Sequence, residues 1–261
     1  MEGDYLKNWF YYIVTFSLLF LTSISVYAGI EPSLVMYLPL DENSGNVSKD
    51  LSPFGNHAVL KGKASWAVGK FNSCIQIVNG CWLEVKDADS LDLTKAMTIN
   101  CWVLIKGMTA EHQSAVEKGD SWEAGEYNLL PCYNPDSVLL QMNDLPEECD
   151  DEALGGKVND GEWHHIAGTW DGKVIKTFVD GKETSRLNCA GELSANNKPL
   201  YIGARGGNQR FMNGLIDEIK VYNRALTDAE IKQDMDNPSA NLAVNDDGKL
   251  SVTWGKVKSK Y

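Results

Sequence analysis

The sequence has few basic residues for its length. Over 261 residues, Lys and Arg number 24 against 36 Asp and Glu, which gives a formal net charge of −12. No basic stripe stands out along the chain, and the acidic balance argues against the electropositive surface with which proteins bind nucleic acid or an anionic membrane. The sequence therefore favours a protein that binds neither.

Several motifs of catalytic and metal-binding proteins are also missing. The sequence contains no Cys-x-x-Cys pair, no Cys/His spacing suited to zinc and no glycine-rich loop followed by the helix that phosphate binding requires. His164 and His165 are adjacent in a strand-like segment, so they point to opposite faces and cannot share one ligand. We interpret both as structural histidines.

A glycoside hydrolase needs two carboxylates that converge on a cleft, about 5 Å or 6.5–9.5 Å apart. Asp217 and Glu218 are neighbours in a strand-like segment and are expected to point to opposite faces. A second group of acids lies in a loop that we interpret as solvated, with a weak calcium loop as the alternative; its members are Glu147, Glu148, Asp150, Asp151 and Glu152. The sequence thus predicts a protein that is not an enzyme.

The N-terminus carries the features of an export segment. From Trp9 to Ile30 there is no charged residue, and Val26-Tyr27-Ala28 offers a small-x-small cleavage site. We predict a signal peptide at residues 1–28; an uncleaved anchor is the alternative, because the stretch is about long enough to cross a bilayer. Either way we expect the remainder to be secreted or at the cell surface, with no membrane insertion after cleavage.

The cysteines agree with export. All six follow the predicted cleavage site, and an oxidising compartment permits them to pair; they are Cys74, Cys81, Cys101, Cys132, Cys149 and Cys189. Six cysteines allow 15 connectivities, and the sequence does not choose among them.

After residue 33, short apolar segments alternate with turn residues, as is typical of a β-sandwich. Asp171-Gly172 and Asp180-Gly181 supply turns on either side of the segment 174–179. Thr227 and Glu230 form a capping-box pattern that predicts one short helix at 227–235, expected at an edge of the sandwich. We expect strands at 34–40, 73–78, 82–86, 97–106, 127–132, 138–142, 163–170, 174–179, 200–203 and 215–222.

Four motifs in this order resemble laminin-G-like domains of the concanavalin A-like jelly-roll type. They are YLPLDENSG at 37–45 with DLSPFGN at 50–56, MTINCWV at 97–103, WHHIAGTWDG at 163–172, and GLIDEIKVYNRALT at 214–227. The resemblance implies an all-β, two-layer antiparallel sandwich with one short C-terminal helix. We place this domain at 29–236 and a C-terminal tail or linker at 237–261.

The resemblance also implies a structural calcium ion between the first and last strands. Asp41 and Asp217 match the positions expected to hold it, with loop carbonyls around 43–46 completing the shell. The alternative is that Asp41 caps a turn and Asp217 pairs with a Lys or Arg. Compared with pentraxins, Ala167 stands where the usual partner of Cys101 is expected, so Cys101 must pair elsewhere or stay free.

Ligand contacts are expected from loops. Trp122 lies in a polar, glycine-flanked loop at 118–123, where an indole can stack on a sugar and Asp120 can accept hydroxyl hydrogen bonds. Arg205 and Asn208 are further candidates. By contrast, we assign the tryptophans within expected strands to the core; these are Trp82, Trp102 and Trp170.

The combined prediction is a non-catalytic module that binds carbohydrate or an extracellular protein. The alternatives are a structural or adhesion domain of a cell-surface assembly, and a glycoside hydrolase or polysaccharide lyase of the same fold.

Overall fold

The computed structural model describes residues 31–241, apart from 79, 109–111, 135, 147–148 and 150–152. The predicted signal peptide at 1–28, most of the predicted tail at 237–261 and the acidic loop residues at 147–148 and 150–152 therefore lie outside the described residues. Within the described ranges, no helix has the length and apolar character needed to span a membrane.

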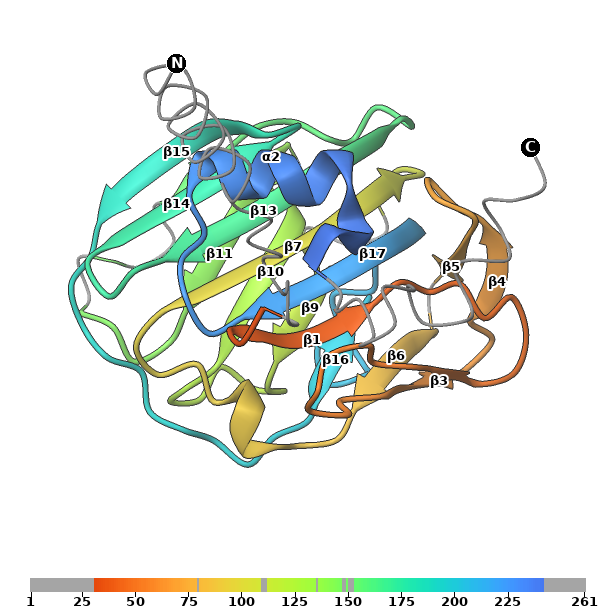
Figure 1. Cartoon of the computed structure of the whole chain (residues 1–261), viewed down its shortest axis with the longest axis horizontal. Helices are drawn as coiled ribbons and strands as arrows, with labels where there is room; N and C mark the ends of the chain where they lie inside the picture. The colour runs from red at the N-terminus through yellow and green to blue at the C-terminus, as the bar shows by residue number, and fades with distance from the viewer. Residues whose placement is uncertain are drawn as a thin grey trace, which may run out of the picture.

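The described residues form two antiparallel sheets that pack as a sandwich (Figure 1). Sheet A has the order β15-β14-β13-β7-β17-β5-β4, and β1 also pairs with β17. Its strands are β1 (Leu34–Leu38), β4 (Ser65–Val68), β5 (Ser73–Ile77), β7 (Met97–Ile105), β13 (Trp163–Trp170), β14 (Val174–Val179), β15 (Lys182–Asn188) and β17 (Gly214–Tyr222). The architecture confirms the predicted two-layer antiparallel fold.

Sheet B has the order β12-β11-β10-β9-β16-β6-β3-β2, and β8 also pairs with β10. Its strands are β2 (Val47–Ser48), β3 (Ala58–Lys61), β6 (Trp82–Val85), β8 (His112–Gln113), β9 (Val116–Lys118), β10 (Tyr127–Tyr133), β11 (Ser137–Met142), β12 (Leu154–Gly155) and β16 (Leu200–Ile202). Short 3-10 turns occur at Asp89–Leu91 and Pro238–Asn241.

Period-2 alternation explains how the strands build the core. Successive side chains point to opposite faces of a sheet, so alternate residues of β7, such as Ile99 and Val103, meet Val116 of β9 and Leu140 of β11 in one buried cluster. Trp170 lies in the same cluster and is fully buried.

The predicted turn between β14 and β15 is confirmed. Asp180 and Gly181 both have positive φ, 49° and 72°, as a tight hairpin turn of this twist requires. This hairpin adds β15, an edge strand that the sequence analysis does not predict. Its outward surface is polar and charged, which protects an open sheet edge from pairing with another chain.

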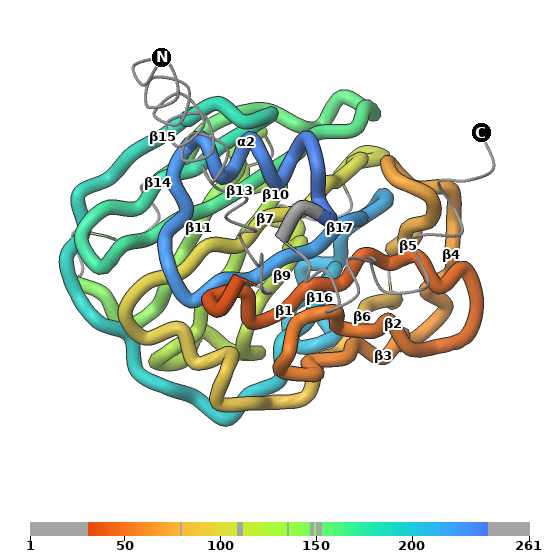
Figure 2. The backbone as a smooth tube through the Cα atoms, in the orientation of Figure 1, coloured from red at the N-terminus to blue at the C-terminus, as the bar shows by residue number. Residues whose placement is uncertain are grey.

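The first and last strands lie side by side (Figure 2). β1 pairs with β17, with Leu38 opposite Ile219. The register of β17 shifts between Asp217 and Lys220 where it pairs with β7, and Glu218 at this bulge has a φ of 53°. The bulge turns Glu218 toward β1, where its carboxylate accepts a 2.5 Å hydrogen bond from the Tyr37 hydroxyl.

The predicted helix is present as α2 (Asp228–Asp236), with both hydrogen bonds of the capping box between Thr227 and Glu230. Its expected place at a sandwich edge is wrong: α2 packs on the outer face of sheet A, where Ile231 contacts an apolar cluster that includes Tyr222 (Figure 1). Asp234 fixes the helix there through a 2.7 Å ion pair with the buried Lys220.

Two of the three strand tryptophans are not in the core between the sheets. Trp102 lies on the outer face of sheet A, 8% exposed, against His165 and under the ammonium group of Lys70, which lies 4.0 Å from the ring centre. Trp82 is half-buried on the outer face of sheet B, where it packs against Gly207. The expected burial is therefore confirmed for Trp102 and Trp170 and is wrong for Trp82, which is only half-buried.

Among the described cysteines, Cys149 and Cys189 form a disulfide. The other four are buried free thiols; they are Cys74, Cys81, Cys101 and Cys132. Cys101 therefore stays free, one of the two outcomes that the sequence analysis left open.

Candidate ligand-binding site

Strand pairing gathers three segments at one end of sheet B. Lys118 at the end of β9 lies opposite both Tyr127 of β10 and Leu200 of β16, and Tyr127 lies opposite Met142 of β11. The segment before β16, the loop at 119–126 and the residues 143–146 therefore leave the sheet at the same end.

Buried Lys118 connects this end of the sheet to the segment before β16. Its ammonium group lies 2.7 Å from Asp87 Oδ1 and donates to the carbonyl oxygens of Lys198, at 2.7 Å, and Asn196, at 3.2 Å. Its side chain is 0% exposed. The segment thus depends on an internal charge for its position.

The four ligand-contact residues predicted from sequence lie together. The Arg205 guanidinium lies 5.8 Å from the centre of the Trp122 ring. A Cβ on Gly206 would come within 2.9 Å of Asp120 Cβ and 3.4 Å of Asn208 Oδ1. The loop from 203 to 213 therefore crosses back over sheet B to reach the loop that carries Trp122.

Arg205 is turned inward rather than toward solvent. Its guanidinium lies 3.3 Å from Glu117 and 3.2 Å from Glu126, and its side chain is 8% exposed. Burial raises the pKa of Glu117 to about 7, although Arg210 and Arg205 attract its charged form. In this geometry Arg205 holds two loops together and offers little polar surface to a ligand.

Asp120 lies on the loop at 119–126 and is more exposed than Arg205, with 34% of its side chain accessible to solvent. Lys198 lies 3.1 Å from its carboxylate, and the Ser121 hydroxyl donates to the same oxygen at 2.9 Å. Burial alone would raise the pKa of Asp120, but these two hydrogen bonds hold it below its ordinary value. Asp120 therefore stays ionised over the ordinary pH range.

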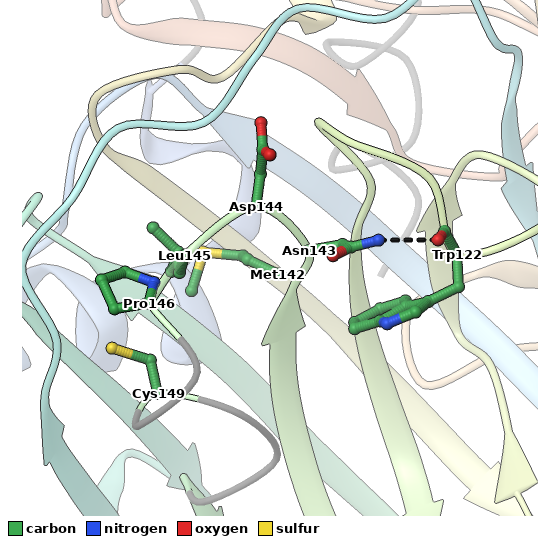
Figure 3. A pocket seen from close by; sticks show the side chains of 7 residues that line it. All are labelled: Trp122, Met142, Asn143, Asp144, Leu145, Pro146 and Cys149. Carbon is green, nitrogen blue, oxygen red and sulfur yellow. Dashed lines mark hydrogen bonds between the residues drawn. The ribbon is translucent and has the colours of Figure 1, made fainter.

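Trp122 lines a pocket of about 200 Å³ (Figure 3). The residues after β11 supply the opposite wall. Among them, the side-chain amide of Asn143 donates a 2.7 Å hydrogen bond to the Trp122 carbonyl. The φ of Trp122 is 65°, a conformation uncommon for a bulky residue and found where surrounding contacts enforce it. The lining residues are Trp122, Met142, Asn143, Asp144, Leu145, Pro146 and Cys149.

Of the described pocket residues, Trp122 alone is predicted from the sequence as a ligand contact. Met142 ends a predicted strand whose hairpin partner begins at Tyr127, so the residues after Met142 had to emerge beside the loop that ends at 126. That pairing was the available indication for Asn143 and Asp144. The contact between Asp144 and Ser194 joins segments 50 residues apart, and no local pattern predicts it.

Asp41 and Asp217, the predicted calcium ligands, both contact the loop at 69–73. Ser73 N donates to Asp41 at 3.2 Å, and Phe71 N donates to Asp217 at 3.0 Å. Burial raises the pKa of Asp217 to about 9, and the nearby charges of Glu218 and Asp41 add to this effect.

Gly69 packs closely against oxygen atoms beside Asp217, so that a side chain at this position would collide with them. A Cβ at Gly69 would lie 2.7 Å from Asp217 Oδ2, 2.7 Å from the Ser73 carbonyl and 2.8 Å from the Phe71 carbonyl. Carboxylate and carbonyl oxygens are the chemical type of donor that calcium prefers. The described ranges hold no group of three or more acidic, His or Cys side chains suited to a metal, and carbonyls would therefore supply much of the shell.

The loop carbonyls expected around 43–46 as calcium ligands stay a prediction. In the structure, the Gly45 carbonyl accepts a 2.9 Å hydrogen bond from the Trp66 indole. The loop that approaches Asp217 is the one between β4 and β5, which β17 brings close because it pairs with β5.

Solved structures with this fold include domains from bacterial proteins. One is domain 4 of AbnA, a GH43 extracellular arabinanase from Geobacillus stearothermophilus, in complex with arabinotriose: TM-score 0.61, 17% identity, covering 77% of this chain and 97% of that one. Another is the binding domain of botulinum neurotoxin DC in complex with rat synaptotagmin II: TM-score 0.60, 12% identity, covering 78% and 51%.

Sequence relatives extend the comparison to animals. Human pappalysin-1 is 29% identical over 106 residues, a match that covers 39% of this chain and 6% of pappalysin-1. The chain thus spans a small fraction of that relative's length. A laminin G family model, described as the concanavalin A-like lectin/glucanases superfamily, matches residues 79–232. The jelly-roll sandwich and this match together show that the chain belongs to the concanavalin A-like lectin/glucanases superfamily.

Proposed function

We propose that this domain is a non-catalytic module that binds a saccharide at the pocket beside Trp122. The observation that carries the proposal is that the half-buried indole of Trp122 lines one pocket together with polar and apolar side chains, and that loops of sheet B form this pocket. Binding residues are commonly placed on loops that a scaffold positions in this way.

The pocket chemistry matches a sugar ring. A sugar presents an apolar C–H face and a rim of hydroxyl groups. Trp122, Met142 and Leu145 provide apolar surface, and Asn143 and Asp144 provide hydrogen-bonding groups. The volume of about 200 Å³ is below the roughly 300–1,000 Å³ of pockets for drug-sized ligands. The pocket therefore accommodates about one ring, with the rest of a chain in solvent.

The carboxylates of the domain support binding rather than hydrolysis. Glycosidases place two carboxylates on either side of the scissile bond, whereas the lining of the pocket, as far as its residues are described, contains one, Asp144. Asp217 and Glu218 are buried on the outer face of sheet A and engaged by protein donors. The arabinotriose complex of the arabinanase domain supports a saccharide ligand, and the synaptotagmin complex of the neurotoxin domain keeps a protein receptor as the second candidate.

Replacing Trp122 with alanine is expected to weaken saccharide binding about tenfold or more, because the stacking surface disappears; tenfold corresponds to about 1.4 kcal/mol. Trp122→Phe should retain most of the affinity. A glycan array identifies the ligand, and titration calorimetry with the best oligosaccharide measures the change.

The matched control is Trp66→Ala, which removes another half-buried tryptophan, from β4 of sheet A. It should leave the affinity unchanged. Binding that survives in Trp122→Ala, or an array on which the wild-type protein binds no glycan, would contradict the proposed site; the second result would favour a protein ligand or a structural and adhesive role.

Calcium forms part of the proposal, as a structural ion held by Asp217 and Asp41 with the carbonyls of Phe71 and Ser73. Its positive charge would offset the cost of burying Asp217 and would tie the β4–β5 loop to β17. It would not contact the saccharide pocket directly, because that pocket is built by loops of sheet B.

Saturating calcium is expected to raise the melting temperature relative to chelator. A ligand at 100 times its Kd stabilises the folded state by about 2.7 kcal/mol, which is roughly 5–11 °C for a domain of this size. Asp217→Asn should abolish the calcium-dependent shift, whereas Asp136→Asn, at an exposed turn, should preserve it. An unchanged melting temperature in calcium removes the ion from the proposal.

Export to an oxidising compartment completes the proposal. The Cys149–Cys189 disulfide supports it, because structural disulfides persist in secreted and surface proteins and are rare in the cytosol.

A further inference from the structure

The pocket beside Trp122 carries a net negative charge. Of its seven described lining residues, only Asp144 is ionisable, because Cys149 is bound in a disulfide. The Asp144 side chain is exposed. Among the described residues, the lining side chains therefore include no cation that could pair with an acidic ligand.

Asp144 is held in place through one carboxylate oxygen. The backbone N–H of Ser194 donates to Oδ2 at 3.1 Å, and the Ser194 hydroxyl donates to the same atom. No donor among the described residues engages Oδ1, which leaves it available at the rim of the pocket. A fixed carboxylate with one open oxygen accepts hydrogen bonds from hydroxyl or ammonium groups and repels anions.

Two described cations on the segments around Trp122, Lys198 and Arg205, are already paired. Lys198 lies 3.1 Å from Asp120 and 3.5 Å from Glu123. Arg205, which faces the Trp122 ring, pairs with Glu117 and Glu126 inside the protein. A carboxylate or sulfate on a ligand would have to displace one of these partners, and it would also meet the long-range repulsion of a chain with a formal net charge of −12.

We propose that the pocket selects saccharides by charge: it takes a neutral or amino-bearing sugar unit and rejects units that carry a carboxylate or sulfate, and Asp144 is the residue that sets this preference. The inference rests on the proposed saccharide-binding function. A free amino group strengthens binding because it donates to Asp144 Oδ1 and pairs with its charge.

The test uses matched tetrasaccharides. The panel contains α-linked and β-linked tetrasaccharides, and each is made in three forms: from the hexose, from the 2-amino-hexose and from the hexuronate. Calorimetry measures the affinity of each form at low and at physiological salt. The wild-type protein should bind the hexose and amino forms about tenfold or more tightly than the hexuronate. The difference should shrink as salt screens the charges.

Asp144→Asn keeps the acceptor for Ser194, and asparagine tolerates the φ of 99° at this position. It should weaken binding of the amino form about threefold and strengthen binding of the hexuronate about threefold. Asp136→Asn, which neutralises an aspartate on the β10–β11 turn that pairs with Lys157, should change neither. If the protein prefers the hexuronate and this binding depends on Trp122, the charge selection is overturned and the proposed saccharide-binding function stands. If no series shows binding that depends on Trp122, the charge selection and the proposed function are both overturned.

Discussion

Replacement of Cys149 and Cys189 by alanine is expected to lower the free energy of unfolding by about 4 kcal/mol. The bond joins residues 40 apart, and in the chain-entropy model a loop of that length restricts the unfolded chain by about this amount. For a domain of this size the melting temperature should fall by roughly 8–16 °C. Calorimetry of the wild type and the double variant measures the change.

The effect should extend to the ligand pocket. Cys149 lines the pocket, and Cys189 is anchored to the core because its carbonyl accepts a hydrogen bond from the Trp170 indole. Without the bond, Cys149 loses its covalent connection to Cys189 at the end of β15, so saccharide affinity should fall as well.

Reductant provides the internal control for this experiment. It should lower the melting temperature of the wild type to that of the double variant and leave the double variant unchanged, because the four other described cysteines are free thiols. An equal shift in both proteins would show that a different disulfide is responsible.

Replacement of Lys118 by methionine is expected to cost about 3 kcal/mol. The change leaves Asp87 and the carbonyls of Asn196 and Lys198 without the ammonium group they surround, and removal of one partner from a buried pair typically costs about 3–5 kcal/mol. We take the low end because Asp87 is 35% exposed and water can reach it. Denaturant unfolding followed by tryptophan fluorescence measures the loss.

Lys157→Met is the matched control for Lys118→Met. Lys157 pairs with Asp136 at 3.1 Å, but its side chain is 61% exposed, so its loss should cost less than about 1 kcal/mol. Lys118→Met should also weaken saccharide binding, because the segment it anchors carries Ser194, which holds Asp144. If the two variants were equally stable, the buried ammonium group of Lys118 would contribute little to the free energy of unfolding.

Features of the fold that depend on neighbouring residues are predictable from the sequence. The turn at Asp180-Gly181 and the capping box at Thr227 and Glu230 are encoded within four residues, and both are present. The edge strand β15 is not predictable in this way, because its sequence KETSRLN lacks a clear apolar alternation and it forms through pairing with β14.

The candidate site likewise contains residues that the sequence predicts and residues that depend on contacts between distant segments. Trp122 is recognisable from its glycine-flanked, polar loop, but Asn143 and Asp144 reach it only through the pairing of β10 with β11 and through Ser194. The inward position of Arg205 depends on Glu117 and Glu126, which are 88 and 79 residues away in the numbering. The disulfide is likewise one of many combinations until the sheets place its cysteines together.

The pairing of β17 has a consequence for synthesis on the ribosome. This strand lies between β7 and β5 and also pairs with β1, all of which are made before residue 106. Nascent chain that has emerged without β17 therefore exposes unpaired edges on its earlier strands, and sheet A closes only after residue 222 has left the exit tunnel. We therefore expect folding of this domain to be completed late, and until then the unpaired edges of the earlier strands are open to pairing with other chains.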